Sequence, residues 1–548
     1  MRPGDPEPEF APPGFATPQD PVFDLPPVET LPPGPEAPLA VQIVVPIETV
    51  RLEGNTVFSD EELAALTAPF EGREVTLEEL EELRFQLTRY YIERGYINSG
   101  AIIPDQEVAD GVITYRIVEG RLTGVRVTGN DRLWTDYVAG RVAPDRDEPL
   151  NLQALQQNLQ LLQQDPLIAR INADLSPGVA AGEAELAVEV EEAPPYEIGF
   201  VVANNRPPSV GAISGLFFGT YRNLTGWGDS IALSYDFSEG TDGFNAAYAF
   251  PFNAGRTQVG VSYERNTSDV VEEPFDDLDI ESDLETISAL VDHAVILTPQ
   301  QRLSLGLRFD RRRSETEVLG EGFPFSLGVE DDGVSKVSVL RFSQDWLLRQ
   351  INQVIAARST FSVGLPIFDA TTNNNDDDVP DSPDGEFLAW LGQFQYARRF
   401  GDRGYQLIFR TDVQLSESSL LPLERFALGG ADSVRGYREN QLVRDSALVS
   451  SVELRVPVFR LPIPNLSGPE EGQVQLAAFA DYGRGWNVDV ETPDPDDLAS
   501  VGLGVRWDPT LKIHAELYWG YALLDVDEPE DDNLQDDGIH FRLEVAYP

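Results

Sequence analysis

The stretch LKIHAELYWGY, residues 511–521, alternates apolar and polar positions with a period of two. The face with the larger apolar side chains consists of Leu511, Ile513, Ala515, Leu517, Trp519 and Tyr521. A β-strand directs successive side chains to opposite faces, so Lys512, His514 and Glu516 share the other face. Charged residues between large apolar ones fit a wall with lipid on one side and water on the other. The stretch therefore predicts a strand of a transmembrane β-barrel.

The same alternation of apolar and polar residues extends from residue 196 to the C-terminus, in segments separated by Gly, Asn and Asp. About 16 candidate strands can be counted, an even number as in bacterial single-chain barrels. These strands are expected at 196–204, 212–222, 229–237, 243–250, 256–265, 283–295, 301–311, 334–345, 352–363, 387–399, 403–415, 446–456, 472–481, 499–508, 511–521 and 538–547. Residues 196–548 are therefore predicted to form a 16-stranded antiparallel transmembrane β-barrel.

The connections between these segments alternate in length, which supports the barrel independently of the strand pattern. Tight turns are expected at 297–300, 401–402 and 508–510. Long loops are expected at 266–282, 312–333, 365–386, 416–445, 482–498 and 522–537. Outer-membrane barrels have short periplasmic turns and long external loops. The connection 457–471 is longer than this pattern predicts for a periplasmic turn.

An internal repeat precedes the barrel: VRLEGN at 50–55 returns as VRVTGN at 125–130. Each copy reads as a short strand that ends at a Gly-Asn turn, followed by two helical patterns and two more strands. The sequence therefore predicts two small α+β modules of β-α-α-β-β order, at 43–120 and 121–193.

The first module offers a candidate binding surface for a partner protein. An unpaired strand edge beside a helix groove can accept an extended chain by β-augmentation. We expect the edge at Ala101, Ile102 and Ile103, and the groove at Leu87 and Tyr91. The simpler alternative is that the modules are only spacers.

Composition narrows the functional classes further. The formal net charge of −53 argues against nucleic-acid binding, which favours a basic surface. The absence of cysteine excludes disulfides, thiolate catalysis and Cys-ligated metals. No phosphate-binding loop or nucleophile elbow occurs, and the three histidines have no metal-ligand spacing. We therefore expect a protein that is not an enzyme and that needs no cofactor or metal.

Residues 1–42 are rich in Pro, Glu and Asp and contain few clustered apolar side chains. Such a segment cannot bury a core, so it is predicted to be a Pro-rich disordered linker. It contains no apolar run of the kind found in a secretory signal.

Two short motifs in the barrel half carry opposite charges. The first, SVRGY at 433–437, places Arg435 in a long loop beside Gly436. The second, FADYG at 479–483, places Asp481 on an alternating strand. Alternation predicts lipid-facing positions at Val474, Leu476, Ala478 and Ala480, and inward positions at Gln473, Gln475, Phe479 and Asp481. An inward carboxylate favours a cationic partner, although a solvated Arg435 and an unrelated Asp481 remain the alternative.

Two β-α-α-β-β modules before a barrel of about 16 strands, with V-R-G-Y and F-x-D-x-G motifs, resemble the TpsB transporters of two-partner secretion. These are the ShlB/FhaC/HecB-type hemolysin secretion/activation proteins, relatives of BamA-type insertases, and their soluble modules are POTRA domains. The resemblance covers roughly residues 43–548. The family often has an N-terminal plug helix, and residues 1–42 show no amphipathic pattern for one.

The resemblance implies that loop 416–445 folds back into the barrel. Arg435 would then meet Asp481, with Val434, Gly436 and Tyr437 completing the loop motif and Phe479 and Gly483 the wall motif. We refer to Arg435 and Asp481 as the latch pair. Its expected use is positional, because the desolvation of two charges offsets much of their attraction.

The function implied by this resemblance is an outer-membrane pore, active as a monomer, with its POTRA domains in the periplasm. It would bind an unfolded TpsA-type exoprotein and translocate it to the cell surface of a Gram-negative-type bacterium. An assembly factor of the BamA or TamA class is the main alternative, although such proteins usually carry more POTRA modules. A simple solute porin is a third possibility, in which the modules would have no purpose.

Overall fold

The structure is a computed structural model that describes residues 15, 44–144, 148–373, 382–469, 471–526 and 533–547. The chain divides into two compact units, one within residues 19–193 and the other comprising residues 194–548 with residues 1–18. The predicted linker and plug region lies outside the described residues, apart from Phe15. The ring centroid of Phe15 lies 4.4 Å from the guanidinium carbon of Arg399 in the second unit.

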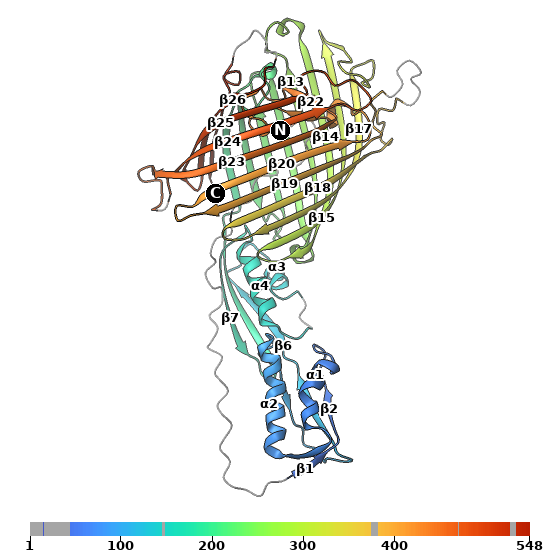
Figure 1. The fold of residues 1–548 in the computed structure, drawn as a ribbon, viewed down its shortest axis with the longest axis vertical. Coiled ribbons are helices and arrows are strands. Elements are labelled where there is room, and N and C mark those ends of the chain that lie inside the picture. Colours follow the sequence, from blue (N-terminus) through green and yellow to red (C-terminus); the bar gives the residue numbers. More distant parts are fainter. Residues whose placement is uncertain are drawn as a thin grey trace. The chain divides into compact units, whose positions relative to one another are not determined.

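The first unit contains two modules built from helices and small sheets (Figure 1). The elements of the first module are β1 (Val44–Ile47), β2 (Thr49–Glu53), α1 (Asp60–Thr67), β3 (Arg73–Thr76), α2 (Leu77–Glu93), β4 (Gly100–Ile102) and β5 (Val112–Val118). Its main sheet has the order β2-β5-β4, while β1 and β3 form a separate antiparallel pair. No helix in the described part of the chain is long and apolar enough to cross a membrane.

The second module repeats the topology of the first. Its elements are β6 (Arg121–Thr128), α3 (Thr135–Val142), α4 (Leu152–Gln163), β7 (Ile168–Pro177) and β8 (Glu183–Glu192). The three-stranded sheets correspond: β2 is parallel to β5 and β6 is parallel to β8, and in each sheet this last strand of the module lies in the middle. The repeat seen in the sequence is therefore a repeat of topology.

A glutamate contact recurs in the two modules and was not apparent from the sequence. In the first module, the backbone N–H groups of Thr56 and Val57 donate to Oε1 of Glu119 at 2.7 and 2.9 Å. In the second, the N–H groups of Arg132 and Leu133 donate to Oε1 of Glu192 at 2.8 and 2.7 Å. Glu119 directly follows β5, and Glu192 is the last residue of β8. Each carboxylate accepts hydrogen bonds from the turn after β2 or β6, so it joins the end of its module to the beginning.

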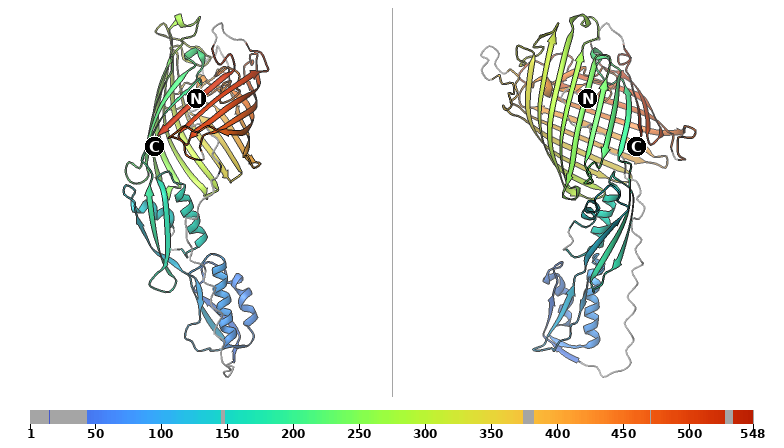
Figure 2. Two further views of the ribbon diagram at one scale, coloured as in Figure 1. Left: turned by 90° about the vertical axis from the view of Figure 1, so that its left-hand side faces the viewer. Right: turned by 180° about the vertical axis from the view of Figure 1, so that it is seen from behind.

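The second unit is a closed antiparallel barrel of sixteen wall strands, with the two-residue strand β16 (Glu321–Gly322) appended to β15 (Figures 1 and 2). The wall strands are β9 (Tyr196–Ala203), β10 (Ser214–Arg222), β11 (Ser230–Phe237), β12 (Thr241–Phe252), β13 (Thr257–Asp269), β14 (Ile280–Leu297), β15 (Gln301–Val318), β17 (Val334–Arg349), β18 (Gln353–Gly364), β19 (Leu388–Phe400), β20 (Tyr405–Ser416), β23 (Ser446–Arg460), β24 (Gln473–Trp486), β25 (Asp497–Thr510), β26 (Ile513–Ala522) and β27 (Ile539–Tyr547). Pairing of β27 with β9 closes the barrel. The predicted fold class, two α+β modules and a 16-stranded barrel, is confirmed.

Several strands are longer than the sequence pattern predicts. The strand expected to end at residue 311 continues to Val318, so the loop expected from residue 312 begins at residue 319. Arg311, Arg312 and Arg313 remain paired with β14 in this extension. A hairpin that projects beyond the lipid needs no apolar face, so the alternation that marks a membrane strand is lost there while the pairing continues.

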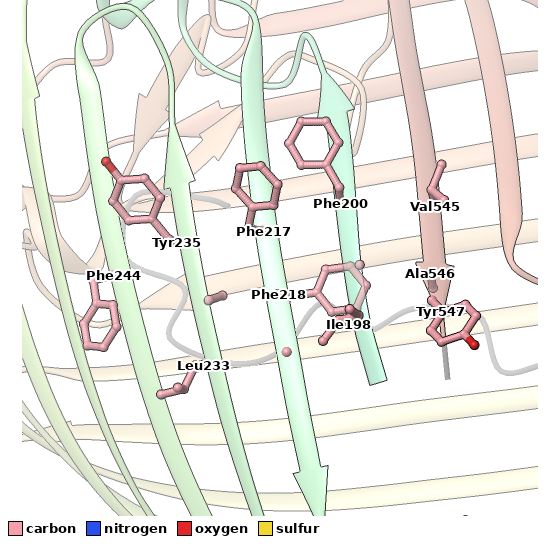
Figure 3. Close-up of a pocket in the computed structure, with 13 residues that line it drawn as sticks. Ile198, Phe200, Phe217, Phe218, Leu233, Tyr235, Phe244, Val545, Ala546 and Tyr547 are labelled. Atoms are coloured by element: carbon pink, nitrogen blue, oxygen red, sulfur yellow. The ribbon is translucent and has the colours of Figure 1, made fainter. Parts of the chain in front are cut away.

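Many large apolar side chains are exposed on the outer face of the barrel. Figure 3 shows a hollow on this face beside the seam between β9 and β27, lined by aromatic and aliphatic side chains. Among them, Ile198 is 55% exposed, Phe217 53% and Tyr547 59%. On β24, Leu476, Ala478 and Ala480 are exposed as predicted, whereas Val474 is buried where the strand irregularity at Phe459 lies opposite it.

Candidate functional site

The connection between β20 and β23, residues 417–445, provides the candidate site. It contains two short antiparallel strands, β21 (Phe426–Leu428) and β22 (Leu442–Arg444), and reverses direction between them. Its apolar side chains pack against inward residues of the wall in a cluster formed by Phe426, Leu428, Val434, Tyr437, Leu442, Ala447, Val449 and Leu498. These contacts place the loop against inward-facing residues of the barrel wall.

The loop places Arg435 directly on Asp481 of β24. Nε of Arg435 donates to Oδ2 of Asp481 at 2.8 Å, and Nη2 donates to Oδ1 at 2.9 Å. The backbone N–H of Arg435 donates to the same Oδ2 at 3.1 Å. The side chains are 9% and 0% exposed. A two-pronged Arg–carboxylate pair with an added backbone bond fixes both the position and the orientation of the loop.

A second carboxylate, on the strand before Asp481, also holds Arg435. Nη1 of Arg435 donates to Oε2 of Glu453 on β23, and the hydroxyl of Tyr518 donates to Oε1 of Glu453 at 3.0 Å. The guanidinium carbon lies 3.6 Å from the ring centroid of Phe479, within range of a cation–π contact. Two carboxylates and an aromatic face therefore surround one buried cation.

The glycines of the two motifs permit this close approach. Gly436 has φ of +92°, a conformation that side chains rarely adopt. A Cβ on Gly436 would lie 2.9 Å from the carbonyl carbon of Gly520, and one on Gly483 would lie 2.8 Å from a methyl group of Val434. The glycine of the wall motif therefore makes room for the valine of the loop motif.

Tyr437 and His540 complete the contacts of the loop tip. The hydroxyl of Tyr437 donates to the carbonyl of Ala499 at 2.8 Å and accepts from the N–H of Leu524 at 3.2 Å. The N–H of Gly436 donates to Nε2 of His540 at 3.2 Å. Tyr437 is 2% exposed, so it packs against the wall as expected and also bonds to two backbone segments.

Sequence reasoning missed Glu453 and Arg438. The sequence could have indicated Glu453, because a charged residue between the apolar Val452 and Leu454 is expected to point inward. Val452 and Leu454 are 45% and 37% exposed on the outer face. Arg438 follows the loop motif directly and bonds to Glu272 at 2.6 Å and to Asp536 at 2.7 Å. Those partners lie in two other loops, so no local pattern could have indicated them.

The predicted partner-binding residues of the first module need correction. Leu87 and Tyr91 are fully buried in the module core, with 0% exposure, and Ala101 is 3% exposed. The helical spacing that suggested a groove marks the core face of α2 instead. Ile102 is 44% exposed on the edge strand β4, and Ile103 lies just beyond that strand. The N–H of Ala101 is already bonded to the hydroxyl of Thr88 at 3.0 Å, so this edge is partly satisfied.

Residues 182–507 match the family of haemolysin secretion/activation proteins ShlB/FhaC/HecB. The chain belongs to this family. Residues 45–120 separately match the POTRA domain of ShlB type, so the first module of this ShlB/FhaC/HecB protein is a POTRA domain.

Two curated relatives align over most of the chain. The outer membrane transporter CdiB of Dickeya dadantii is 24% identical over 478 residues, which cover 84% of this chain and 80% of that protein. The heme/hemopexin transporter protein HuxB of Haemophilus influenzae is 21% identical over 530 residues, covering 91% and 86%.

Solved structures share the fold. CdiB from Escherichia coli has a TM-score of 0.70 at 21% identity, with 96% of this chain and 94% of that chain covered. BamA from Haemophilus ducreyi lacking POTRA domains 1-3 has a TM-score of 0.54 at 14% identity, covering 92% and 100%. At these identities the likeness concerns the fold alone, so the family match distinguishes a secretion transporter from an assembly factor.

Proposed function

We propose that the protein is the outer-membrane transporter of a two-partner secretion system, and that loop 416–445 is the movable obstruction of its pore. A secreted exoprotein is the partner, and the POTRA modules face the periplasm. The single observation that carries the role of the loop is its buried, charge-paired position inside a closed barrel. A chain that crosses this lumen has to displace the loop.

The proposed cycle has three steps. An unfolded exoprotein docks on the POTRA modules, where the exposed Ile102 on the edge strand offers a contact. The latch pair then opens and the loop tip leaves the path of the chain. Finally, the exoprotein threads through the pore and folds outside, which makes its movement irreversible because no nucleotide or ion gradient is available at that membrane.

The test is secretion of the cognate exoprotein by cells that carry Arg435→Ala or Asp481→Asn. We expect export to fall while the barrels still assemble, as judged by their fast migration in unheated gels. Normal export by both variants would refute the latch.

Depletion of the protein separates a transporter from an assembly factor. Loss of one exoprotein alone is expected for a secretion transporter. Broad loss of outer-membrane proteins would instead support the BamA-like alternative.

Three finer points belong to the same proposal. The apolar outer face contacts lipid, one barrel suffices for transport, and the protein catalyses no reaction. Crosslinking of the purified protein in vesicles checks the second point: a dimer at the lowest protein density would contradict it.

A further inference from the structure

The first part of loop 416–445 carries its own buried charge, Glu424, of opposite sign to Arg435. Glu424 is 7% exposed. Nη2 of Arg341 on β17 donates to both of its carboxylate oxygens at 2.9 Å, and Nη1 of Arg312 on β15 donates to Oε1 at 3.0 Å. The loop therefore pairs a carboxylate with one part of the barrel wall and a guanidinium group with another part.

The wall at this point is built to receive an anion. Nε of Arg341 donates to Oδ2 of Asp310 at 2.8 Å, and Nε of Arg308 donates to Oδ1 of Asp310 at 2.6 Å. Arg312 adds a third guanidinium group to this cluster, bonded to Glu424. Removal of Glu424 would take away the carboxylate that pairs with both Arg341 and Arg312, and breaking one partner of a buried ion pair is costly.

Apolar packing reinforces this attachment at the base of the loop. Leu420, Leu421 and Leu423 are 0%, 1% and 7% exposed. They form a cluster with Val337, Val339, Phe387 and Ala389 of β17 and the start of β19, separate from the cluster around Arg435. The base of the loop thus has an independent core.

The two attachments lie on different parts of the wall. Glu424 binds β15 and β17, whereas Arg435 binds β23 and β24. Strands β18, β19 and β20 separate β17 from β23. The two attachments therefore share no wall strand.

We propose that Glu424 is a positioning residue that keeps the base of the loop in the lumen when the latch pair opens. The loop then swings at its tip, residues 429–441, about a fixed base. This inference rests on the proposed role of the loop as a movable obstruction, and it specifies which part moves.

The test exploits the absence of cysteine from the chain. Single substitutions Ser419→Cys at the base and Ser433→Cys at the tip both replace buried hydroxyl groups, 4% and 6% exposed. The rate of labelling by a water-soluble maleimide is measured on the full chain in lipid vesicles. Arg435→Ala is expected to accelerate labelling at position 433 by at least about tenfold, equivalent to about 1.4 kcal/mol, and to leave position 419 unchanged. Glu424→Gln is expected to accelerate labelling at position 419.

Matched variants exclude a general loosening of the barrel. Asp345→Asn removes a carboxylate from β17 itself, where Asp345 pairs with Arg358 of β18, and should leave both labelling rates unchanged. Glu424→Asp keeps the charge and should restore most of the protection. If Glu424→Gln does not fold, Arg312→Gln removes one of the two cations and should give a smaller acceleration at position 419.

Two results would overturn the proposal. One is protection of position 419 at the wild-type rate in folded Glu424→Gln and Arg312→Gln barrels. The other is equal acceleration of both positions by Arg435→Ala, which would mean that a single latch releases the whole loop. Secretion is measured in a separate experiment. Normal export by a barrel whose loop 416–445 is crosslinked to the wall would refute the proposed function and would leave the labelling result valid.

Discussion

The POTRA modules and the barrel place charge in opposite environments. On the module surface, Arg89 and Glu93 of α2 form a pair whose side chains are 66% and 54% exposed. In the barrel, Arg435 and Asp481 form a pair whose side chains are 9% and 0% exposed. The modules bury apolar side chains around this exposed pair, whereas the barrel has apolar side chains on its outer face and buries the latch pair inside. An ion pair is therefore expected to be decisive in the barrel and minor on the modules.

The largest effect is expected from Asp481→Asn. Breaking one partner of a buried pair typically costs about 3–5 kcal/mol, and Glu453 still offsets part of the charge of Arg435 in this variant. The loop should become mobile and the single-channel conductance in planar bilayers should rise. Asp345→Asn serves as the control with the same change of side chain. Equal conductance of Asp481→Asn and the unaltered protein would show that this buried pair does not hold the loop.

A middle-sized effect is expected from Glu119→Gln in the first module. The carboxylate accepts bonds from two N–H groups, the hydroxyl of Thr56 and the hydroxyl of Tyr91 at 3.0 Å. Weakening this set should cost about 1–3 kcal/mol of module stability. The measurement is the urea midpoint of helical circular dichroism, since the α-helices of the described residues lie in the modules. The equivalent variant Glu192→Gln should behave similarly, and an unchanged midpoint in both would contradict the closing role of these residues.

The same carboxylate predicts a pH dependence of the modules. Burial raises the pKa of Glu119, but the hydrogen bonds from Thr56, Val57 and Tyr91 outweigh it and hold the pKa below its usual range. A carboxyl group with a lowered pKa in the folded state stabilises above its unfolded pKa, and this contribution is lost as the pH falls through the folded value. The urea midpoint should therefore drop on acidification, and Glu119→Gln should reduce that drop. A parallel decline in both proteins would assign the pH effect to other groups.

The smallest effect is expected from Arg89→Gln. Exposed helix pairs are weakened by water and salt, so the urea midpoint of the modules should stay within error of the unaltered protein. Added salt should shift the urea midpoint of Arg89→Gln and that of the unaltered protein by the same amount. A large shift would mean that this exposed pair is more important than its exposure indicates.

Much of the site was accessible from the sequence, for specific reasons. Period-two alternation placed Asp481 inward, and a long loop with a glycine beside Arg435 placed a cation within reach. Arg438 and Glu424 escaped because their partners come from strands or loops far away in the chain, whereas Glu453 could have been found from the alternation of its own strand. Leu87 and Tyr91 were misassigned because a helical apolar stripe shows which face is buried, and gives no information on what a partner could touch.

The sequence by itself determined the division into two modules and a barrel, the number of strands and the face of each strand that meets lipid. These properties follow from local periodicity, which each segment carries in its own residues. Only the tertiary structure decided the path of loop 416–445, because that path depends on the register and closure of sixteen strands. Those global features bring Glu424 to Arg341, Arg435 to Asp481 and Arg438 to Glu272 and Asp536, and so attach one loop to the barrel through charges of both signs.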